Sequence, residues 1–190
     1  MNLLFIGDVV GQSGCDFLES RMYKLKREYD IDVTVVNGEN SAQGNGITPQ
    51  SYRQLLNMGA DVVTTGNHSF RRREAEELYD TNEQLLRPAN YPEGVMGHGV
   101  TYIDMCPYKI AVVNLMGTMY MEAVENPFNY VDKLLESIDT PNIIVDFHAE
   151  ATSEKKAMGF YLQKRCTAVL GTHTHVQTAD EMILGGHTAY

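Results

Sequence analysis

Apolar side chains in the first third of the chain follow two alternating periodicities. Residues 2–7 and 33–36 are short, nearly continuous apolar runs, as expected of buried strands, and 61–65 gives a third. Residues 12–29, between the first two runs, carry apolar positions at helical spacing instead. Strands that alternate with helices in this way predict right-handed crossovers and a parallel sheet.

The second half of the chain is more mixed. Residues 100–105 and 109–115 read as two strands joined at Pro107-Tyr108, which predicts an antiparallel hairpin. Further helices are expected from Thr48-Pro49 onward, around 74–77, at 128–138 and at 153–165, and further strands at 142–146, 167–170 and 181–184. No Pro/Gly/Ser-rich linker divides the chain, so we predict a single α/β domain over residues 1–190, with the hairpin in a second, partly antiparallel sheet.

Composition and charge narrow the class of protein. Of the 190 residues, 43% are hydrophobic and 21% charged, as in ordinary globular proteins. The formal net charge of −10 argues against a protein that coats nucleic acid, and we expect no stable nucleic-acid complex. A phosphate substrate remains compatible with this charge, since bound divalent ions can reverse the local polarity of a site.

Neither the apolar runs nor the cysteines indicate export or membrane attachment. No run approaches the roughly 20 apolar residues of a membrane helix, and the run near the N-terminus is too short for a signal peptide. Cys15, Cys106 and Cys166 are widely spaced and form no CxxC motif. We therefore expect a cytoplasmic protein with free thiols and no membrane partner.

Polar residues suited to metal binding follow five of the predicted strands. They stand in Gly7-Asp8, Asn37-Gly38-Glu39-Asn40, Gly66-Asn67-His68, Phe147-His148-Ala149-Glu150 and Gly171-Thr172-His173-Thr174-His175. In a parallel sheet the carboxyl ends of the strands lie on one edge, where open α/β folds bind ligands, so we expect these residues to converge. The glycines beside them would let the backbone turn sharply at the strand ends.

The candidate ligands form an oxygen and nitrogen set without thiolates. They are the carboxylates of Asp8 and Glu39, the amides of Asn40 and Asn67, and the imidazoles of His148, His173 and His175. Such a set suits manganese, iron or zinc ions rather than a structural zinc held by cysteines. Seven ligands are about right for two ions that share a bridge, either Glu39 or a water. Two ions roughly 3.5–4 Å apart activate a bridging hydroxide for attack at phosphorus, which predicts a dinuclear phosphoesterase.

Single residues of this set have simpler interpretations. Asp8 alone could cap a helix or a turn. The glycines of Gly7–Gly14 do not follow GxGxxG, and the neighbouring aspartate would repel phosphate, which disfavours a dinucleotide-binding loop. His148 alone could be a core or loop histidine. His173 and His175 are a stronger signal, because alternate residues of an extended segment face the same side.

His68 stands directly beside a candidate ligand and could act in catalysis. An imidazole at this point could protonate the departing alkoxide as a general acid. The competing interpretation makes His68 an eighth ligand. Arg71–Arg73 follow at once, and we favour a solvated face for them over contact with substrate phosphate. The sequence identifies no other substrate-binding residue.

Taken together, these segments resemble the YmdB-like family of calcineurin-type metallophosphoesterases. The resemblance rests on Gly7–Gly11, Asn37–Asn40, Gly66–His68, the run from Asp146 through Lys155, and Gly171–Glu181. In the wider superfamily the first motif is Asp-x-His, whereas position 10 here is Val. The superfamily's Gly-Asp-x-x-Asp is replaced by Gly38-Glu39-Asn40, and both differences point to this subfamily.

The resemblance implies a calcineurin-like metallophosphoesterase fold, a four-layer α/β/β/α sandwich, with two metal ions. Iron is expected first, then manganese, with zinc as a third candidate. One ion would be held by Asp8, Glu39, Asn40 and His175, and the other by Glu39, Asn67, His148 and His173, with His68 as proton donor. Family members continue beyond the position of Tyr190, so we expect the second sheet of this chain to lack strands.

The implied activity is hydrolysis of cyclic nucleotides, in particular 2′,3′-cyclic ones, as small-molecule phosphodiester substrates. One alternative is a phosphomonoesterase or nuclease that uses the same centre. Another is a regulatory protein that binds metal or nucleotide without turnover. A single structural metal is the third, and a homo-oligomer is compatible with all of them.

Overall fold

Two β-sheets form the middle of the molecule, in a computed structural model that describes residues 1–190. The first sheet contains four parallel strands in the order β1 (Leu3–Ile6), β2 (Val33–Asn37), β3 (Val62–Thr64) and β4 (Leu85–Leu86). The second contains six strands in the order β5 (Val100–Asp104), β6 (Lys109–Met116), β7 (Ile143–His148), β8 (Ala168–Thr172), β10 (Thr188–Ala189) and β9 (Ile183–Leu184). The predicted antiparallel hairpin is confirmed as β5 and β6.

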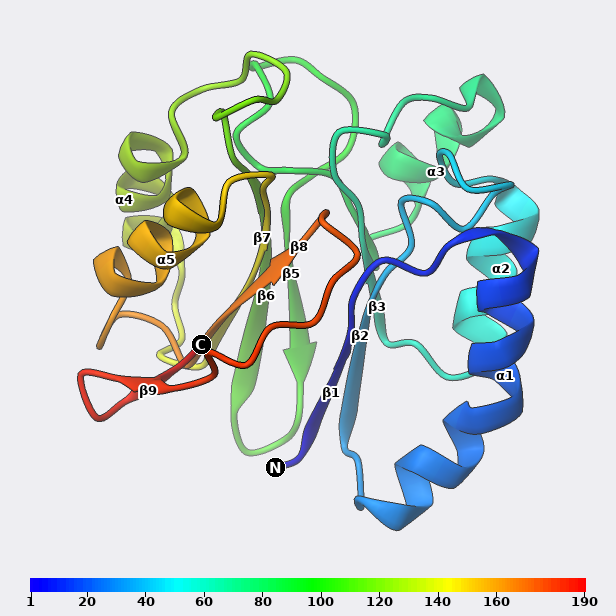
Figure 1. Ribbon diagram of the computed structural model, residues 1–190, viewed down its shortest axis with the longest axis horizontal. Helices are drawn as coiled ribbons and strands as arrows, with labels where there is room; N and C mark the ends of the chain where they lie inside the picture. Colours follow the sequence, from blue (N-terminus) through cyan, green and yellow to red (C-terminus); the bar gives the residue numbers. More distant parts are fainter.

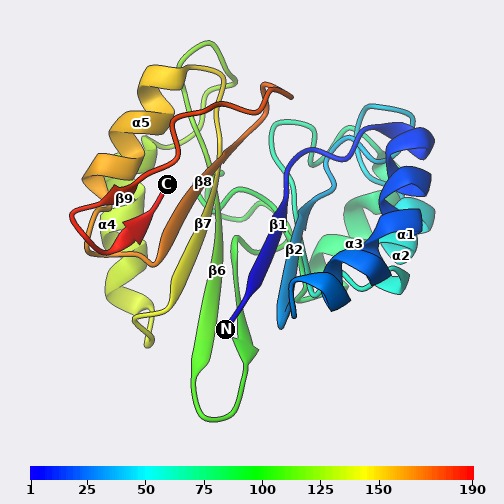
Figure 2. The same cartoon turned by 60° about the horizontal axis from the view of Figure 1, so that its bottom comes forward.

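Helices cover the outer faces of both sheets. Three of them, α1 (Gly11–Glu28), α2 (Pro49–Asn57) and α3 (Glu76–Thr81), lie against the first sheet, and a 3₁₀ turn at Arg73–Ala75 precedes α3. The other two, α4 (Pro127–Ser137) and α5 (Thr152–Tyr161), lie against the second sheet (Figure 1). The result is the four-layer α/β/β/α sandwich that the family resemblance implied, and Figure 2 shows the two sheets face to face. No helix combines the length and apolar content needed to cross a bilayer.

The continuous apolar runs of the sequence are explained by burial on both faces of a strand. All five residues of β2 are buried. Because alternate side chains of a strand point to opposite faces, Val35 packs between the two sheets and Val36 packs under the helices. Strands covered on both sides read as unbroken hydrophobic segments rather than as alternating ones.

The start of α2 follows its local sequence. The Thr48 side chain accepts a hydrogen bond from the backbone N–H of Ser51, and the Ser51 hydroxyl accepts one from the backbone N–H of Thr48. This reciprocal capping box satisfies two N–H groups that have no partner within the helix. Pro49 follows in the first turn, where a missing N–H does no harm.

One prediction about the strands is wrong. The polar strand ends do not share a single parallel sheet, because β1, β2 and β3 belong to the first sheet and β7 and β8 to the second. The strand ends nevertheless meet, since both sheets present their carboxyl ends in the same direction (Figure 1). In addition, β7 continues to His148 and β8 to Thr172, each two residues beyond the predicted end. The short strands β4 and β10 were not predicted.

A buried carboxylate connects the two sheets just below these strand ends. Asp146 on β7 accepts hydrogen bonds from the hydroxyl of Thr64 at 2.5 Å and from the amide of Asn37 at 3.0 Å, both on the first sheet. A third bond, at 2.7 Å, comes from the hydroxyl of Thr172 on the neighbouring strand β8. Burial raises the pKa of Asp146 to about 6, although the positive charge of His148 and these three donors favour its charged form.

The hydrogen bond from Thr64 to Asp146 gives a prediction about stability. Thr64→Val should lower the free energy of unfolding by about 1–3 kcal/mol, because a buried carboxyl group loses a donor. Thr34→Val is the matched control, since Thr34 is also buried on the first sheet and its hydroxyl has no hydrogen-bond partner. The control should be neutral or stabilising. Urea unfolding measures both variants, and equal losses would contradict the role assigned to the hydroxyl of Thr64.

Candidate metal centre

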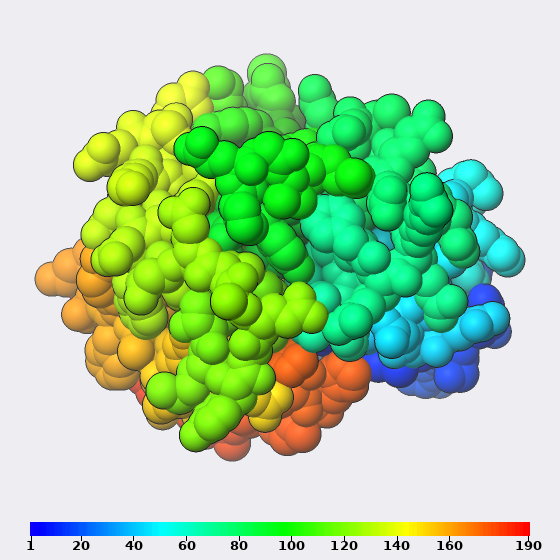
Figure 3. Space-filling view, turned by 90° about the horizontal axis from the view of Figure 1, so that it is seen from above, coloured from blue at the N-terminus to red at the C-terminus, as the bar shows by residue number.

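The predicted metal ligands and His68 lie together where the strands of both sheets end. The cluster comprises Asp8 after β1, Glu39 and Asn40 after β2, Asn67 and His68 after β3, His148 as the last residue of β7, and His173 and His175 after β8. Figure 3 looks onto this face of the molecule, where segments far apart in the sequence meet. The convergence that the sequence predicted is therefore present, although it joins two sheets rather than one.

Glu39 lies in the middle of this cluster, and its side chain is completely buried. Its Oε1 is 3.2 Å from Nε2 of His148 and 3.3 Å from Nδ1 of His68. Its Oε2 accepts a hydrogen bond from the backbone N–H of His68 at 3.1 Å. Burial by itself raises the pKa of Glu39, but the hydrogen bonds with His148 and His68 outweigh it and hold that pKa well below the usual range. Glu39 is thus an ionised carboxylate in contact with residues of both sheets.

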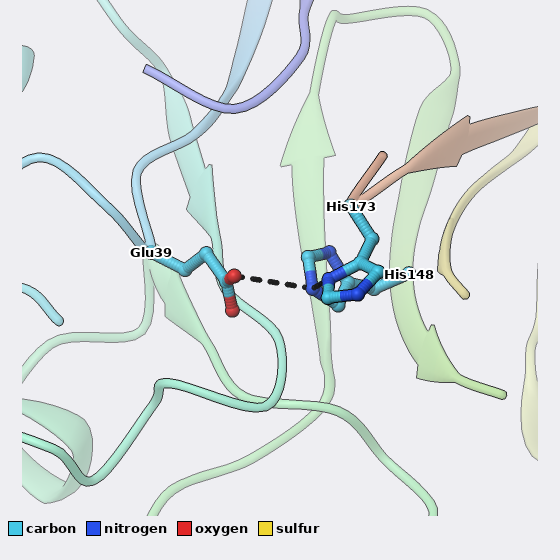
Figure 4. A group of neighbouring side chains, drawn as sticks. All are labelled: Glu39, His148 and His173. Carbon is cyan, nitrogen blue, oxygen red and sulfur yellow. Dashed lines mark hydrogen bonds and ion pairs between the residues drawn. The ribbon is translucent and has the colours of Figure 1, made fainter. Parts of the chain in front are cut away.

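Three atoms with lone pairs surround Nε2 of His148. They are Oδ1 of Asn67 at 3.0 Å, Nδ1 of His173 at 3.1 Å and Oε1 of Glu39 at 3.2 Å. In Figure 4 the carboxylate of Glu39 points at the two imidazole rings from the opposite side. One hydrogen on Nε2 cannot bridge to three acceptors, whereas a metal cation fits among all of them.

The charge of His148 agrees with this interpretation. Burial lowers the pKa of His148, but the hydrogen bond and the negative charge of Glu39 outweigh burial and raise it. Positive charge is therefore favoured at this point of the structure. Ligand atoms of Glu39, His148 and His173 also lie within 4.8 Å of one another, close enough to share one ion.

A second group of candidate ligands surrounds Asp8. Its Oδ1 is 3.3 Å from Nε2 of His175 and 3.4 Å from Nδ2 of Asn40. Its Oδ2 accepts a hydrogen bond from the backbone N–H of His173 at 2.9 Å. Asn40 presents its nitrogen to this group, while its Oδ1 lies 2.8 Å from Nδ1 of His68. Asn40 can offer an oxygen to a cation only after its amide group has turned over.

The histidine pair reaches the cluster by a route that the sequence did not predict. Residues 173 and 174 form a bend rather than part of an extended segment, and His173 has φ 96° and His175 φ 52°. Positive φ is uncommon for residues other than glycine, and such strain concentrates at functional sites. The side chain of Lys155 donates a hydrogen bond to the hydroxyl of Thr174, between the two histidines, at 2.9 Å.

The glycines beside the candidate ligands do not make left-handed turns, which corrects the expectation from the sequence. None of Gly7, Gly38, Gly66 and Gly171 has a positive φ. A Cβ on Gly66 would overlap the ring of His148 and the carboxylate of Glu39. The backbone at Gly66 therefore approaches the ligands as closely as it does because it carries no side chain.

His68 differs from the ligands in the direction of its ring. Its Nδ1 faces Asn40 and Glu39, whereas its Nε2 takes part in no hydrogen bond within the protein. The side chain is 24% exposed. One ring nitrogen is thus held by the cluster and the other is free to face a substrate, which favours the general-acid interpretation over an eighth ligand.

The arginines after His68 have structural partners. Arg72 donates hydrogen bonds to the carbonyl groups of Asn45, at 2.8 Å, and Ala42, at 3.4 Å, and so holds the loop that follows Glu39. Arg71 forms an exposed ion pair with Glu122 at 3.0 Å. The solvated-face interpretation suits Arg71, and the structural role of Arg72 was not predicted.

Sequence reasoning also missed the carboxylates next to the histidines. Oε2 of Glu150 lies 3.0 Å from Nε2 of His173, and Asp146 reaches His148 through Thr172. The alternation Asp146-x-His148-x-Glu150 is visible in the sequence. Carboxylates that hold the second nitrogen of a histidine are common around metal sites, so this alternation could have identified them.

The sequence matches one family model over almost its whole length. The model is described as YmdB-like protein and covers residues 4–190, which include every residue of the cluster. A relative from Bacillus subtilis (strain 168), named 2′,3′-cyclic-nucleotide 2′-phosphodiesterase, is 47% identical over 192 residues. The match covers 100% of this chain and 73% of the relative.

Two of the solved structures similar to this one also match it closely in sequence. A hypothetical protein from Thermus thermophilus matches with a TM-score of 0.95 and 39% identity, over 100% of this chain and 74% of the other. A structure from Mycoplasma pneumoniae described as a novel phosphatase matches with a TM-score of 0.94 and 33% identity, over 99% of this chain and 69% of the other. The similarity in sequence therefore extends to the whole fold.

The close approach of the Gly66 backbone to His148 and Glu39 predicts that a methyl group added at this position disturbs the site. After dialysis against Mn²⁺, the Gly66→Ala protein should contain much less bound metal than the unmodified protein, because the added Cβ displaces His148 and Glu39. Gly7→Ala is the control, since a Cβ there meets nothing within 4 Å although the residue adjoins Asp8. Elemental analysis gives the metal content and circular dichroism checks folding. A folded Gly66→Ala protein with unchanged metal content would show that this packing does not shape the site.

Proposed function

The chain belongs to the YmdB-like protein family, and from this we propose that it is a metal-dependent phosphodiesterase that hydrolyses 2′,3′-cyclic nucleotides. The observation that carries the proposal is the set of lone-pair atoms around Nε2 of His148, among which a metal cation fits. The name of the Bacillus subtilis relative supports the substrate class.

The donor atoms divide into two overlapping sets that share Glu39. Asp8, Asn40 and His175 would hold one ion together with Glu39, and Asn67, His148 and His173 would hold the other together with Glu39. Oxygen and imidazole donors suit iron or manganese, with zinc as a third candidate. When bound, two such ions would supply Lewis-acid chemistry, polarising the phosphoryl oxygens and lowering the pKa of a nearby water.

The protein itself supplies the proton for the leaving group. Oε1 of Glu39 lies 3.3 Å from Nδ1 of His68. This contact does not depend on which way the amide of Asn40 faces, so the ring is oriented and Nε2 is the nitrogen that points away from the candidate ligands. A proton held on Nε2 can pass to the ribose oxygen as its bond to phosphorus breaks. Without this transfer the ribose would have to leave as an unstable alkoxide.

A second candidate, hydrolysis of phosphomonoesters, is favoured by one observation. The similar structure from Mycoplasma pneumoniae is described as a phosphatase. The same ligand set would serve either reaction, because a monoester and a diester present the same phosphoryl oxygens to it. The two functions therefore have to be separated by substrate rather than by geometry.

A side-by-side assay tests the substrate class. With Mn²⁺ present, the protein should hydrolyse 2′,3′-cyclic nucleotides with a higher kcat/KM than 4-nitrophenyl phosphate, a monoester, and than single-stranded RNA. Product formation is followed by chromatography for the nucleotides and by absorbance for the nitrophenyl ester. Equal or faster turnover of the monoester would replace the proposal with the phosphatase alternative. Bound metal and nucleotide without any turnover would indicate a binding protein.

Removal of the imidazole of His68 tests the role of general acid. His68→Ala should lower kcat for a cyclic nucleotide by about 10²–10⁴-fold, with the metal content unchanged. With bis(4-nitrophenyl) phosphate the loss should be much smaller, because nitrophenolate leaves without a proton. His187→Ala, an exposed histidine in the turn between β9 and β10, should have no effect on either substrate. Loss of metal from His68→Ala would instead identify His68 as a ligand.

A further inference from the structure

We propose that Thr172 and Asp146 fix the metal-binding tautomer of His148 through a buried relay of hydrogen bonds. The inference rests on the proposed metal centre and adds two residues that are not themselves ligands. In the relay, Nδ1 of His148 donates to the hydroxyl oxygen of Thr172, and that hydroxyl donates to Asp146. Nε2 is thereby left without a hydrogen and free to bind an ion.

The three residues meet because of strand register. His148 on β7 lies opposite Thr172 on β8. Asp146 and His148 are two residues apart on one strand, so their side chains point to the same face, toward the first sheet. All three side chains are buried, with residue exposures of 0%, 0% and 4% for Asp146, His148 and Thr172.

The direction of each hydrogen bond follows from counting hydrogens. Oγ1 of Thr172 lies 2.9 Å from Nδ1 of His148 and 2.7 Å from Oδ1 of Asp146. The hydroxyl has one hydrogen, and a carboxylate can only accept, so that hydrogen goes to Asp146. Oγ1 must then accept from His148, which requires a hydrogen on Nδ1.

The opposite arrangement would leave a buried group without its partner. If Nδ1 of His148 carried no hydrogen, Thr172 would have to donate to it and withdraw from Asp146. Asp146 would retain the donors Thr64 and Asn37 on its Oδ2, but Oδ1 would lose the bond from Thr172. An unsatisfied carboxylate oxygen in the interior is costly, so the structure selects the Nδ1–H form.

This selection determines what His148 can offer to an ion. The ring nitrogen that faces Glu39, Asn67 and His173 is Nε2, so all four atoms at that point present lone pairs to a bound cation. Partners that hold the second nitrogen of a ligating histidine orient the ring and raise its basicity. Thr172 and Asp146 are positioning residues in this sense, since neither touches the ion or the substrate.

Metal affinity of matched variants tests the relay. Thr172→Val keeps the shape of the side chain but removes the hydroxyl, and we expect it to weaken Mn²⁺ binding at one site by about 10–100-fold in isothermal titration calorimetry. Thr172→Ser restores the hydroxyl and should bind as the unmodified protein does. Thr34→Val removes a buried hydroxyl that has no partner, and it should also leave the affinity unchanged. Unchanged affinity in folded Thr172→Val would overturn the proposal.

Nuclear magnetic resonance tests the tautomer without any variant. In Zn²⁺-loaded protein labelled with ¹⁵N-histidine, the ring of His148 should show a slowly exchanging proton on Nδ1. A proton on Nε2 instead would overturn the proposal even if Thr172→Val fails to fold. Neither measurement depends on turnover, so loss of the relay and loss of the proposed diesterase activity are distinguishable. A protein that shows the relay but hydrolyses no cyclic nucleotide would support this inference and refute the proposed function.

Discussion

A carboxylate that is buried between two β-sheets has to obtain its hydrogen-bond donors from the protein, and Asp146 obtains them from both sheets. Thr64 and Asn37 reach it from the first sheet and Thr172 from the second. These bonds fix how the ends of β2 and β3 lie against the ends of β7 and β8. Glu39, which follows β2, and His148, which ends β7, are each two residues beyond a member of this network, so their meeting depends on it.

The centre above this junction concentrates negative charge and lone pairs. Asp8 and Glu39 bring carboxylates, and the surrounding amides and imidazoles bring further acceptors, in a chain whose formal net charge is already −10. Such an assembly is unfavourable until a cation neutralises it. Bound metal ions, rather than a basic surface, would therefore attract an anionic phosphate substrate to a chain with a formal net charge of −10.

The residue types of the site were predictable from the sequence because their chemistry does not depend on the fold. A histidine or a carboxylate after a buried strand is recognisable in any sheet, and all the predicted ligands indeed lie together. The division into two sheets could not be derived from the apolar runs, since a strand buried on both faces has the same pattern in either sheet. The hairpin at 100–115 indicated a second, partly antiparallel sheet, but only the family resemblance anticipated the four-layer sandwich. The two-residue strands β4 and β10 were missed because so short a segment has no periodicity. Likewise, the space left by Gly66 and the bend at 173 and 174 depend on atoms that are distant in the sequence.

The left-handed backbone at His173 and His175 has a thermodynamic consequence. Each residue held in such a conformation costs on the order of 1–3 kcal/mol, which the rest of the fold has to offset. Bonds to residues outside the centre hold the bend, such as the one from Lys155 to Thr174. A fold that holds the bend in this way preorganises the two histidines, so free energy released on coordination would appear as affinity instead of being consumed in rearranging the backbone.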